Sequence, residues 1–272
     1  TGFVGTPYFC SVLSENGAND AAYTLLLNDD FPSWLYAVKL GATTIWERWN
    51  SVLPDGTISG TDMNSLNHYA YGSIAEWMYQ YMCGINPVED GPGFRKIKLS
   101  PKPYGKLEHA KASLNSASGY IESGWEIKED GTLSFNFIVP FNTSAHVILP
   151  DAAYEDIKVN GVTLSDSVIA AQQNGQHVHF ELVAGIYVFE YMPTKSYILT
   201  FSTKNSLKEL LENDVTREIF EEELPEIASN GLVKARFLEK SLRELTEVPL
   251  FKALAPNEKL DELDERLVLV RQ

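Results

Sequence analysis

Basic residues are scarce in this chain of 272 residues, and their scarcity excludes whole classes of partner. The 22 Lys and Arg residues are outnumbered by 37 Asp and Glu residues, which gives a formal net charge of −15. A phosphate backbone must be met by clustered Lys and Arg, so we expect no nucleic-acid partner. The same balance argues against an anionic membrane surface. A neutral ligand such as a sugar is compatible with it.

Cysteine is almost absent as well. Cys10 and Cys83 are the only two, too few for a disulfide framework, and no Cys/His spacing is typical of zinc. Both lie in apolar stretches of helical pattern, so we expect two buried free thiols. The sequence predicts no metal site and no cofactor.

Long apolar runs are also missing from these 272 residues. No run is long enough to span a bilayer, so we expect no membrane partner. We expect no signal peptide within these residues, since Thr1-Gly2-Phe3 opens directly into fold-like sequence, and we expect the true N-terminus to lie elsewhere. The compartment of this protein, which could be the bacterial cytoplasm, the periplasm or the exterior, therefore stays open.

What is present is an ordinary globular composition, with 44% hydrophobic and 22% charged residues. Residues 1–86 are predicted to form helical hairpins. Three helices are marked by start signals at Thr6-Pro7, at Asn19 or Asp20, and at Pro32. The longest predicted helix runs from Ser65 to Cys83.

Residues 87–202 change to a period of two. Gly119–Lys128 and Thr132–Val139 flank a turn and predict a hairpin. Further strands are predicted at Phe94–Leu99, Ala145–Leu149, Gln176–Leu182, Ile186–Tyr191 and Tyr197–Phe201. Short strands at this spacing predict an antiparallel β-sandwich. Residues 203–272 return to a helical pattern and form a small helical tail, in which an acidic run at 221–223 is expected to be a solvated face.

The densest cluster of chemically useful side chains lies at 41–49. Glu47 stands beside Trp46, Arg48 and Trp49. Aromatic rings pack against the apolar faces of a pyranose, and carboxylates and Arg bind its hydroxyls. A carboxylate can also take a proton from water. These residues are therefore candidates for a sugar site.

A structural explanation of Glu47 competes with this one. Thr44-x-x-Glu47 is a capping-box pattern, which would place Glu47 in the first turn of a helix. Both roles can hold together, because the helix dipole there favours the ionised form that a general base needs. Trp46 and Trp49 would then share one helix face, where core packing is the alternative role.

Asn67 and His68 form a second candidate group at the predicted start of the long helix. The polar side chains of a first helical turn can point into a cavity, where they would bind sugar hydroxyls. Capping or packing is the alternative for His68. No partner carboxylate for Glu47 stands out, because the other acidic residues read as caps, turns or helix surface: Glu15, Asp20, Asp55, Asp62 and Glu76.

Several motifs resemble the bacterial α-L-rhamnosidases of glycoside hydrolase family 78. The resemblance covers residues 1 to about 200, and its most specific part is Ala42-Thr43-Thr44-Ile45-Trp46-Glu47-Arg48-Trp49. Other pieces occur in order, at Thr1–Pro7, Pro32-Ser33-Trp34, Ser65–Ser73, Pro92-Gly93-Phe94 and Gly119–Trp125.

The resemblance implies the last hairpins of a six-hairpin (α/α) barrel, followed by the family's C-terminal β-sandwich. It implies removal of terminal α-L-rhamnose from glycosides or polysaccharides with inversion and without a metal. Glu47 matches the general base, and Trp46, Arg48, Trp49 and His68 match places near the rhamnose subsite. The family's general acid lies before the residue that matches Thr1.

Two departures from the family pattern follow. Asn50 stands where many relatives carry an aspartate, which would weaken a hydrogen bond near the site. Because the general acid is missing, we expect this chain alone to be inactive. Helix faces that lack their hairpin neighbours would favour instability or a homo-oligomer. Two alternatives remain: a non-catalytic carbohydrate-binding or scaffolding protein, and an (α/α)-barrel hydrolase for another sugar.

Overall fold

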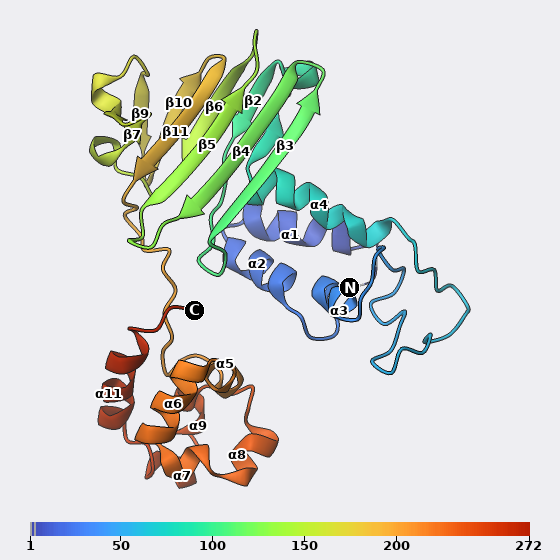
Figure 1. Ribbon diagram of the computed structural model, residues 1–272, viewed down its shortest axis with the longest axis vertical. Helices are drawn as coiled ribbons and strands as arrows, with labels where there is room; N and C mark the ends of the chain where they lie inside the picture. The colour runs from blue at the N-terminus through green and yellow to red at the C-terminus, as the bar shows by residue number, and fades with distance from the viewer. Residues whose placement is uncertain (1, 3) are drawn as a thin grey trace. The chain divides into compact units, whose positions relative to one another are not determined.

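The computed structural model describes residues 2 and 4–272, apart from the side chain of Lys234, and its contacts define two compact units (Figure 1). The first unit ends at Tyr197 and the second runs from Ile198 to Gln272. The first holds helices followed by two β-sheets, and the second is helical, so the predicted fold class is confirmed. The predicted domain boundaries between residues 86 and 87 and between residues 202 and 203 stay predictions.

Three helices open the first unit as predicted: α1 (Thr6–Glu15), α2 (Asn19–Leu27) and α3 (Trp34–Lys39). The side chain of Ser33 caps α3 by accepting a hydrogen bond from the Tyr36 amide at 3.0 Å. One face of α1 is buried, but Val4, Tyr8 and Val12 are more than half exposed beside it. The homo-oligomer stays a prediction, and this exposed apolar stripe is where it would form.

The predicted helix from Ser65 to Cys83 is wrong in its first turn. The helical segment begins only at Ala70, as η1 (Ala70–Ser73), and continues through α4 (Ile74–Trp77) and the π-helical η2 (Met78–Met82). Backbone amides and carbonyls before Ala70 form hydrogen bonds with the loop around Glu47 instead. His68 donates its amide to the Ile45 carbonyl at 2.8 Å, and the Ser65 carbonyl accepts from the Glu47 amide at 2.9 Å. These pairings with the 41–50 loop replace the expected helical hydrogen bonds.

Two sheets form the sandwich that follows. The five-stranded sheet has the order β1 (Ile85–Pro87), β2 (Lys96–Leu99), β6 (Ser144–Leu149), β10 (His177–Leu182) and β9 (Ala171–Asn174). The six-stranded sheet has the order β3 (His109–Ser116), β4 (Gly119–Ile127), β5 (Leu133–Val139), β11 (Gly185–Tyr191), β7 (Lys158–Val159) and β8 (Val162–Thr163). The predicted β4–β5 hairpin is confirmed, and β2–β6 is parallel where antiparallel pairing was expected. Short 3₁₀ turns lie at η3 (Pro92–Phe94), η4 (Tyr154–Asp156) and η5 (Leu164–Asp166).

The predicted strand Tyr197–Phe201 is wrong. Its two ends form hydrogen bonds with different segments of the chain. The Tyr197 hydroxyl donates to Asp151 at 2.7 Å, and the Phe201 amide donates to the Val270 carbonyl at 3.1 Å. The segment passes from one compact unit to the other, and its pairing within the described chain is limited to an isolated antiparallel bridge between Thr200 and Arg271.

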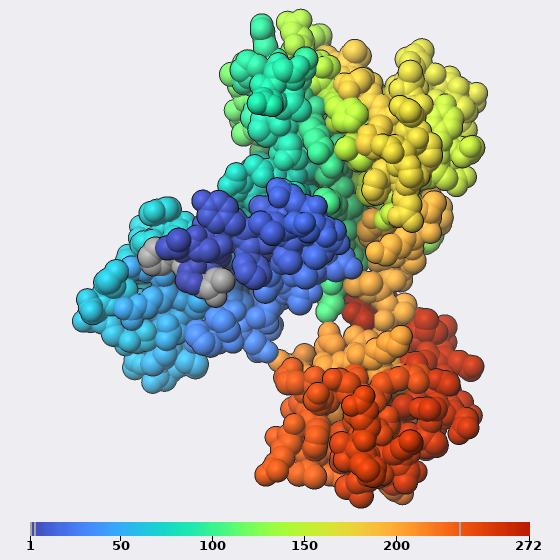
Figure 2. Space-filling view, turned by 180° about the vertical axis from the view of Figure 1, so that it is seen from behind, coloured from blue at the N-terminus to red at the C-terminus, as the bar shows by residue number. Residues whose placement is uncertain are grey.

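One apolar core joins the first helices to the sandwich. Cys10, Tyr23 and Trp77 belong to the same buried cluster as the strand residues, and both cysteines are buried free thiols as predicted. The Trp125 indole of β4 donates to the Met82 carbonyl at 2.8 Å, which fastens the end of the helical segment to the sheet. Figure 2 shows the blue helices in contact with the green part of the sandwich from behind.

The second unit has its own core and seven helices along its described length. These are α5 (Leu207–Glu212), α6 (Asp214–Glu223), α7 (Pro225–Ala228), α8 (Gly231–Arg236), α9 (Leu242–Leu245), α10 (Pro249–Lys252) and α11 (Asn257–Leu267). Capping boxes start α5 and α9. The acidic run is more than a solvated face, because Glu222 and Glu223 both pair with Arg266. Along the described chain, no helix combines the length and apolar character needed to cross a bilayer.

Candidate active site

Glu47 lies in an irregular loop and not in a helix. The capping box with Thr44 is absent, because the Thr44 hydroxyl donates to the Leu66 carbonyl. The Glu47 carboxylate instead accepts the Ser65 amide at 2.8 Å, while its own amide donates to the Ser65 carbonyl. The prediction that a helix dipole favours the ionised form of Glu47 is therefore wrong, because no helix begins there. A reciprocal pair of hydrogen bonds with Ser65 fixes the carboxylate in its place.

The half-buried side chain of Glu47 lines a hollow of about 360 Å³. The other lining residues are Gly2, Phe31, Arg48, Trp49, Asn50, Met63 and Tyr71. Among the residues that the structure describes, Glu47 supplies the only carboxylate of this hollow. One hydrogen bond uses a small part of the acceptor capacity of a carboxylate, so the group can still bind water or a hydroxyl.

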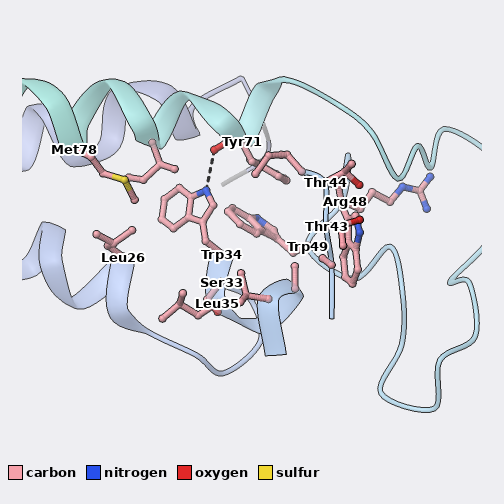
Figure 3. A pocket seen from close by; sticks show the side chains of 16 residues that line it. Leu26, Ser33, Trp34, Leu35, Thr43, Thr44, Arg48, Trp49, Tyr71 and Met78 are labelled. Atoms are coloured by element: carbon pink, nitrogen blue, oxygen red, sulfur yellow. Dashed lines mark hydrogen bonds between the residues drawn. The ribbon is translucent and has the colours of Figure 1, made fainter. Parts of the chain in front are cut away.

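Trp34, Trp49 and Tyr71 form an aromatic wall (Figure 3), and two of them, Trp49 and Tyr71, also line the hollow of Glu47. The Trp49 ring stacks on Tyr71 with centroids 3.8 Å apart and planes 15° apart, and the Trp34 ring meets Trp49 edge-on at 5.2 Å. The Trp34 indole donates to the Tyr71 carbonyl at 2.9 Å, drawn as the dashed line in Figure 3. These contacts fix the ring of Trp49, which lines the same hollow as Glu47.

Trp46 and Trp49 do not share a helix face, because residues 41–50 form no helix. Trp46 is buried and lines a second, apolar hollow of about 360 Å³ together with side chains of α2, α3 and α4. Trp49 and Tyr71 line both hollows. Trp46 therefore packs on the apolar side, whereas Trp49 reaches the side of Glu47.

Arg48 lines the Glu47 hollow and braces the loop that follows. Its guanidinium donates to the Asp62 carbonyl, and its amide donates to the Ser51 hydroxyl at 3.1 Å. Figure 3 shows the Arg48 side chain pointing away from the aromatic wall.

Asn67 and His68 lie in the loop before Ala70, so the first-turn placement expected for them is wrong. Asn67 is exposed, and His68 accepts the Ala70 amide on Nδ1 at 3.3 Å while its ring stacks on Tyr69. Neither residue lines the hollow of Glu47. Their substrate-binding roles, like those of Trp46, Arg48 and Trp49, stay predictions.

Tyr71, Phe31 and Met63 line the hollow, but sequence reasoning assigned them no role. Tyr71 lies inside the Ser65–Ser73 run that carries the family resemblance, and this was the only available signal for it. Phe31 and Met63 sit in loops without a motif of their own, so their place depends on the loop fold.

Two of the other acidic candidates for a catalytic partner, Asp55 and Glu15, make hydrogen bonds within the fold. Asp55 accepts bonds from Thr57, which lower its pKa. Glu15 accepts the Tyr81 hydroxyl at 2.7 Å, and burial together with this carboxylate raises the pKa of Tyr81 to about 12. Within the described part of the chain, no cluster of three His, Cys, Asp or Glu side chains is arranged to hold a metal.

Comparison with known proteins follows the same division of the chain. Residues 1–82 match the model of the bacterial α-L-rhamnosidase six-hairpin glycosidase domain, and residues 84–163 match that of the bacterial α-L-rhamnosidase C-terminal domain. The first segment is thus the end of a glycosidase hairpin domain, since the C-terminal domain follows directly. Residues 1–163 of this chain are therefore the end of the hairpin domain and the C-terminal domain of the bacterial α-L-rhamnosidase family.

Individual relatives agree with this assignment. An α-L-rhamnosidase of Formosa agariphila is 46% identical over 160 residues, which are 59% of this chain and 17% of that protein. The crystal structure of Streptomyces avermitilis α-L-rhamnosidase complexed with L-rhamnose superposes with a TM-score of 0.62 at 36% identity, over 70% of this chain and 18% of that one. The α-L-rhamnosidase from Dictyoglumus thermophilum also gives 0.62, at 32% identity, over 71% of this chain and 21% of that one. This chain therefore spans about a fifth or less of the length of each of these relatives.

Proposed function

We propose that this chain forms part of an inverting α-L-rhamnosidase and that Glu47 is its general base. The observation that carries the proposal is the position of the carboxylate. Glu47 is fixed by the Ser65 amide and lines a hollow of about 360 Å³ that Trp49 also lines. The Streptomyces avermitilis relative was solved with L-rhamnose, which makes this sugar the natural substrate to test.

In this proposal the Glu47 carboxylate accepts a proton from a water molecule as the water oxygen attacks the anomeric carbon. The bond between the anomeric carbon and the leaving oxygen breaks, and a carboxylic acid protonates that oxygen. The Trp49 face, stacked on Tyr71, packs against the apolar side of the sugar ring. Arg48 and Asn50, which line the same hollow, bind hydroxyl groups.

The general acid must come from outside the 272 residues. An inverting pair of carboxyl groups is separated by roughly 6.5–9.5 Å to admit water. No second carboxylate lines the hollow among the described residues, and Glu15, Asp55 and Glu76 are engaged in hydrogen bonds elsewhere. We therefore expect the 272-residue chain by itself to be inactive on rhamnosides.

Hydrolysis of a chromogenic α-L-rhamnoside tests the proposal, with this chain and with a protein in which the whole hairpin domain is present. In the longer protein, Glu47→Gln should lower kcat by roughly a thousandfold or more, because it removes the base and keeps the shape. Glu76→Gln, a change on the exposed surface of α4, is the matched control and should keep full activity.

Two outcomes would reject it. Activity of the 272-residue chain that disappears in Glu47→Gln would mean that an acid lies within these residues. A longer protein that is folded, inactive on rhamnosides and active on another glycoside would favour an (α/α)-barrel hydrolase for another sugar.

A further inference from the structure

A groove of about 480 Å³ crosses the outer face of the six-stranded sheet, far along the chain from Glu47. Strands β3, β4 and β5, side by side in Figure 1, supply most of its lining. Lys111, Gly124 and Asn136 face one another across these strands in direct register. We propose that this groove binds a neutral oligosaccharide, independently of the site at Glu47.

Asn136 is the residue that packing does not explain. Asparagine is disfavoured in strands, and β5 is a central strand with neighbours on both sides. The Asn136 side chain is exposed and makes no hydrogen bond among the described residues, so both its amide donor and its carbonyl acceptor are open to a ligand. Residues that break a local rule without a structural gain tend to mark functional positions.

Gly124 gives the groove its depth. A Cβ at this position would lie 3.2 Å from the Ala110 carbonyl oxygen and 3.2 Å from the Lys111 Cβ. The glycine thus allows β3 to approach β4 closely, and it leaves no side chain between Lys111 and Asn136. Interior glycines in strands often mark such close approaches.

The charges around the groove disfavour an anionic ligand. The Lys111 ammonium pairs with Glu122 at 3.0 Å, and the Tyr120 hydroxyl donates to the same carboxylate at 2.7 Å. Burial raises the pKa of Glu122, but the hydroxyl and the ammonium outweigh it and leave the pKa below its usual value. The cation is therefore already neutralised, and Glu126 adds a negative charge.

The groove also offers an apolar surface beside its polar groups. Ile138 and Ile186 are register partners on the same face, and Ile186 is 71% exposed. Sugar rings present hydroxyls at their edges and C–H groups on their faces. An amide, a fixed carboxylate and a pair of isoleucines match this combination.

Binding of rutinose, a neutral disaccharide of rhamnose and glucose, to the isotopically labelled full chain tests the proposal by NMR titration. We expect amide shifts at 109–111, 122–126 and 136–138. Asn136→Thr should weaken binding by roughly tenfold, because the shorter threonine hydroxyl cannot reproduce the separate donor and acceptor of the amide. Since threonine is favoured in strands, the same change should raise the unfolding temperature. Asn115→Thr, on the same face and outside the groove, should leave binding unchanged.

Three results would overturn the proposal. One is the absence of shifts at millimolar rutinose. Another is a set of shifts confined to residues 41–71, which would assign all binding to the Glu47 hollow. The third is equal binding of the dianion digalacturonic acid in the groove, which would refute a neutral ligand. The titration follows the amide signals of residues 109–138 directly. Its result therefore does not depend on whether Glu47 is the general base.

Discussion

Replacing Asp264 of α11 by Ala should destabilise the second unit strongly. Its carboxylate accepts bonds from the amide and the hydroxyl of Thr203, which is fully buried, and from the Arg243 guanidinium at 2.7 Å. The change leaves two Thr203 donors without Asp264 and removes a charged partner of Arg243. Each unsatisfied buried donor costs about 1–3 kcal/mol, so we expect a total near 3 kcal/mol.

Asp261→Ala is the matched control. Asp261 lies on the same helix and binds the same Arg243 at 2.6 Å, but its side chain is 68% exposed. An exposed ion pair contributes about 0–1 kcal/mol. Both substitutions place Ala in α11, so helix propensity largely cancels between them. Comparable losses in the two variants would refute the argument that burial of Thr203 sets the cost.

The chain allows this measurement without separating its units. All five tryptophans precede residue 198, so tryptophan fluorescence follows the first unit only. The helical circular dichroism signal contains the second unit, whose melting should shift by about 10–20 °C in Asp264→Ala. The tryptophan transition should not move.

The acid dependence of the same variant gives a second test. Burial raises the pKa of Asp264, but the bonds from Thr203 and Arg243 outweigh it, and the pKa lies below the usual 3.8. The ionised group therefore stabilises the fold above pH 3.8 and loses this effect as the pH falls through the lowered pKa. The stability gap between the wild-type chain and Asp264→Ala should narrow there, and a gap that widens in acid would contradict the assignment.

Two further predictions concern the first unit. Gly84→Ala should prevent stable folding, because a Cβ there would lie 2.1 Å from the Pro101 nitrogen. Gly56→Ala is the control: Gly56 is also at positive φ but has open space around it, so the change should cost about 1 kcal/mol. Equal melting temperatures of the two variants would contradict this. Burial raises the pKa of Cys10 to about 11 and that of Cys83 to about 12, so neither thiol should react with a disulfide reagent at pH 8 until urea unfolds the chain.

The periodicity of the sequence predicted the parts of the fold that are held by local patterns. The helices after Thr6, Asn19 and Pro32, and the hairpin across residues 128–132, are encoded by caps, glycines and alternating side chains within a few residues. These signals need no knowledge of the rest of the chain.

The errors arose where distant segments compete for the same backbone groups. Ser65–Tyr69 has a helical pattern, but the loop around Glu47 takes its amides and carbonyls. Thr44 and Glu47 fit a capping box, yet both bond to the 65–66 segment. A hydrogen bond between residues about twenty positions apart leaves no periodic trace, so Tyr71 and the loop geometry of the hollow could not be predicted from the sequence.

The bond from Trp125 to the Met82 carbonyl has a consequence for how such proteins can change. It lies in one core shared by Tyr23, Trp77 and the sandwich strands, although two family models meet between residues 82 and 84. A recombination event at that boundary would have to bring a compatible partner surface with it. The sandwich is therefore not an independent module that recombination could exchange alone. We expect it to be inherited together with the helices that share its core.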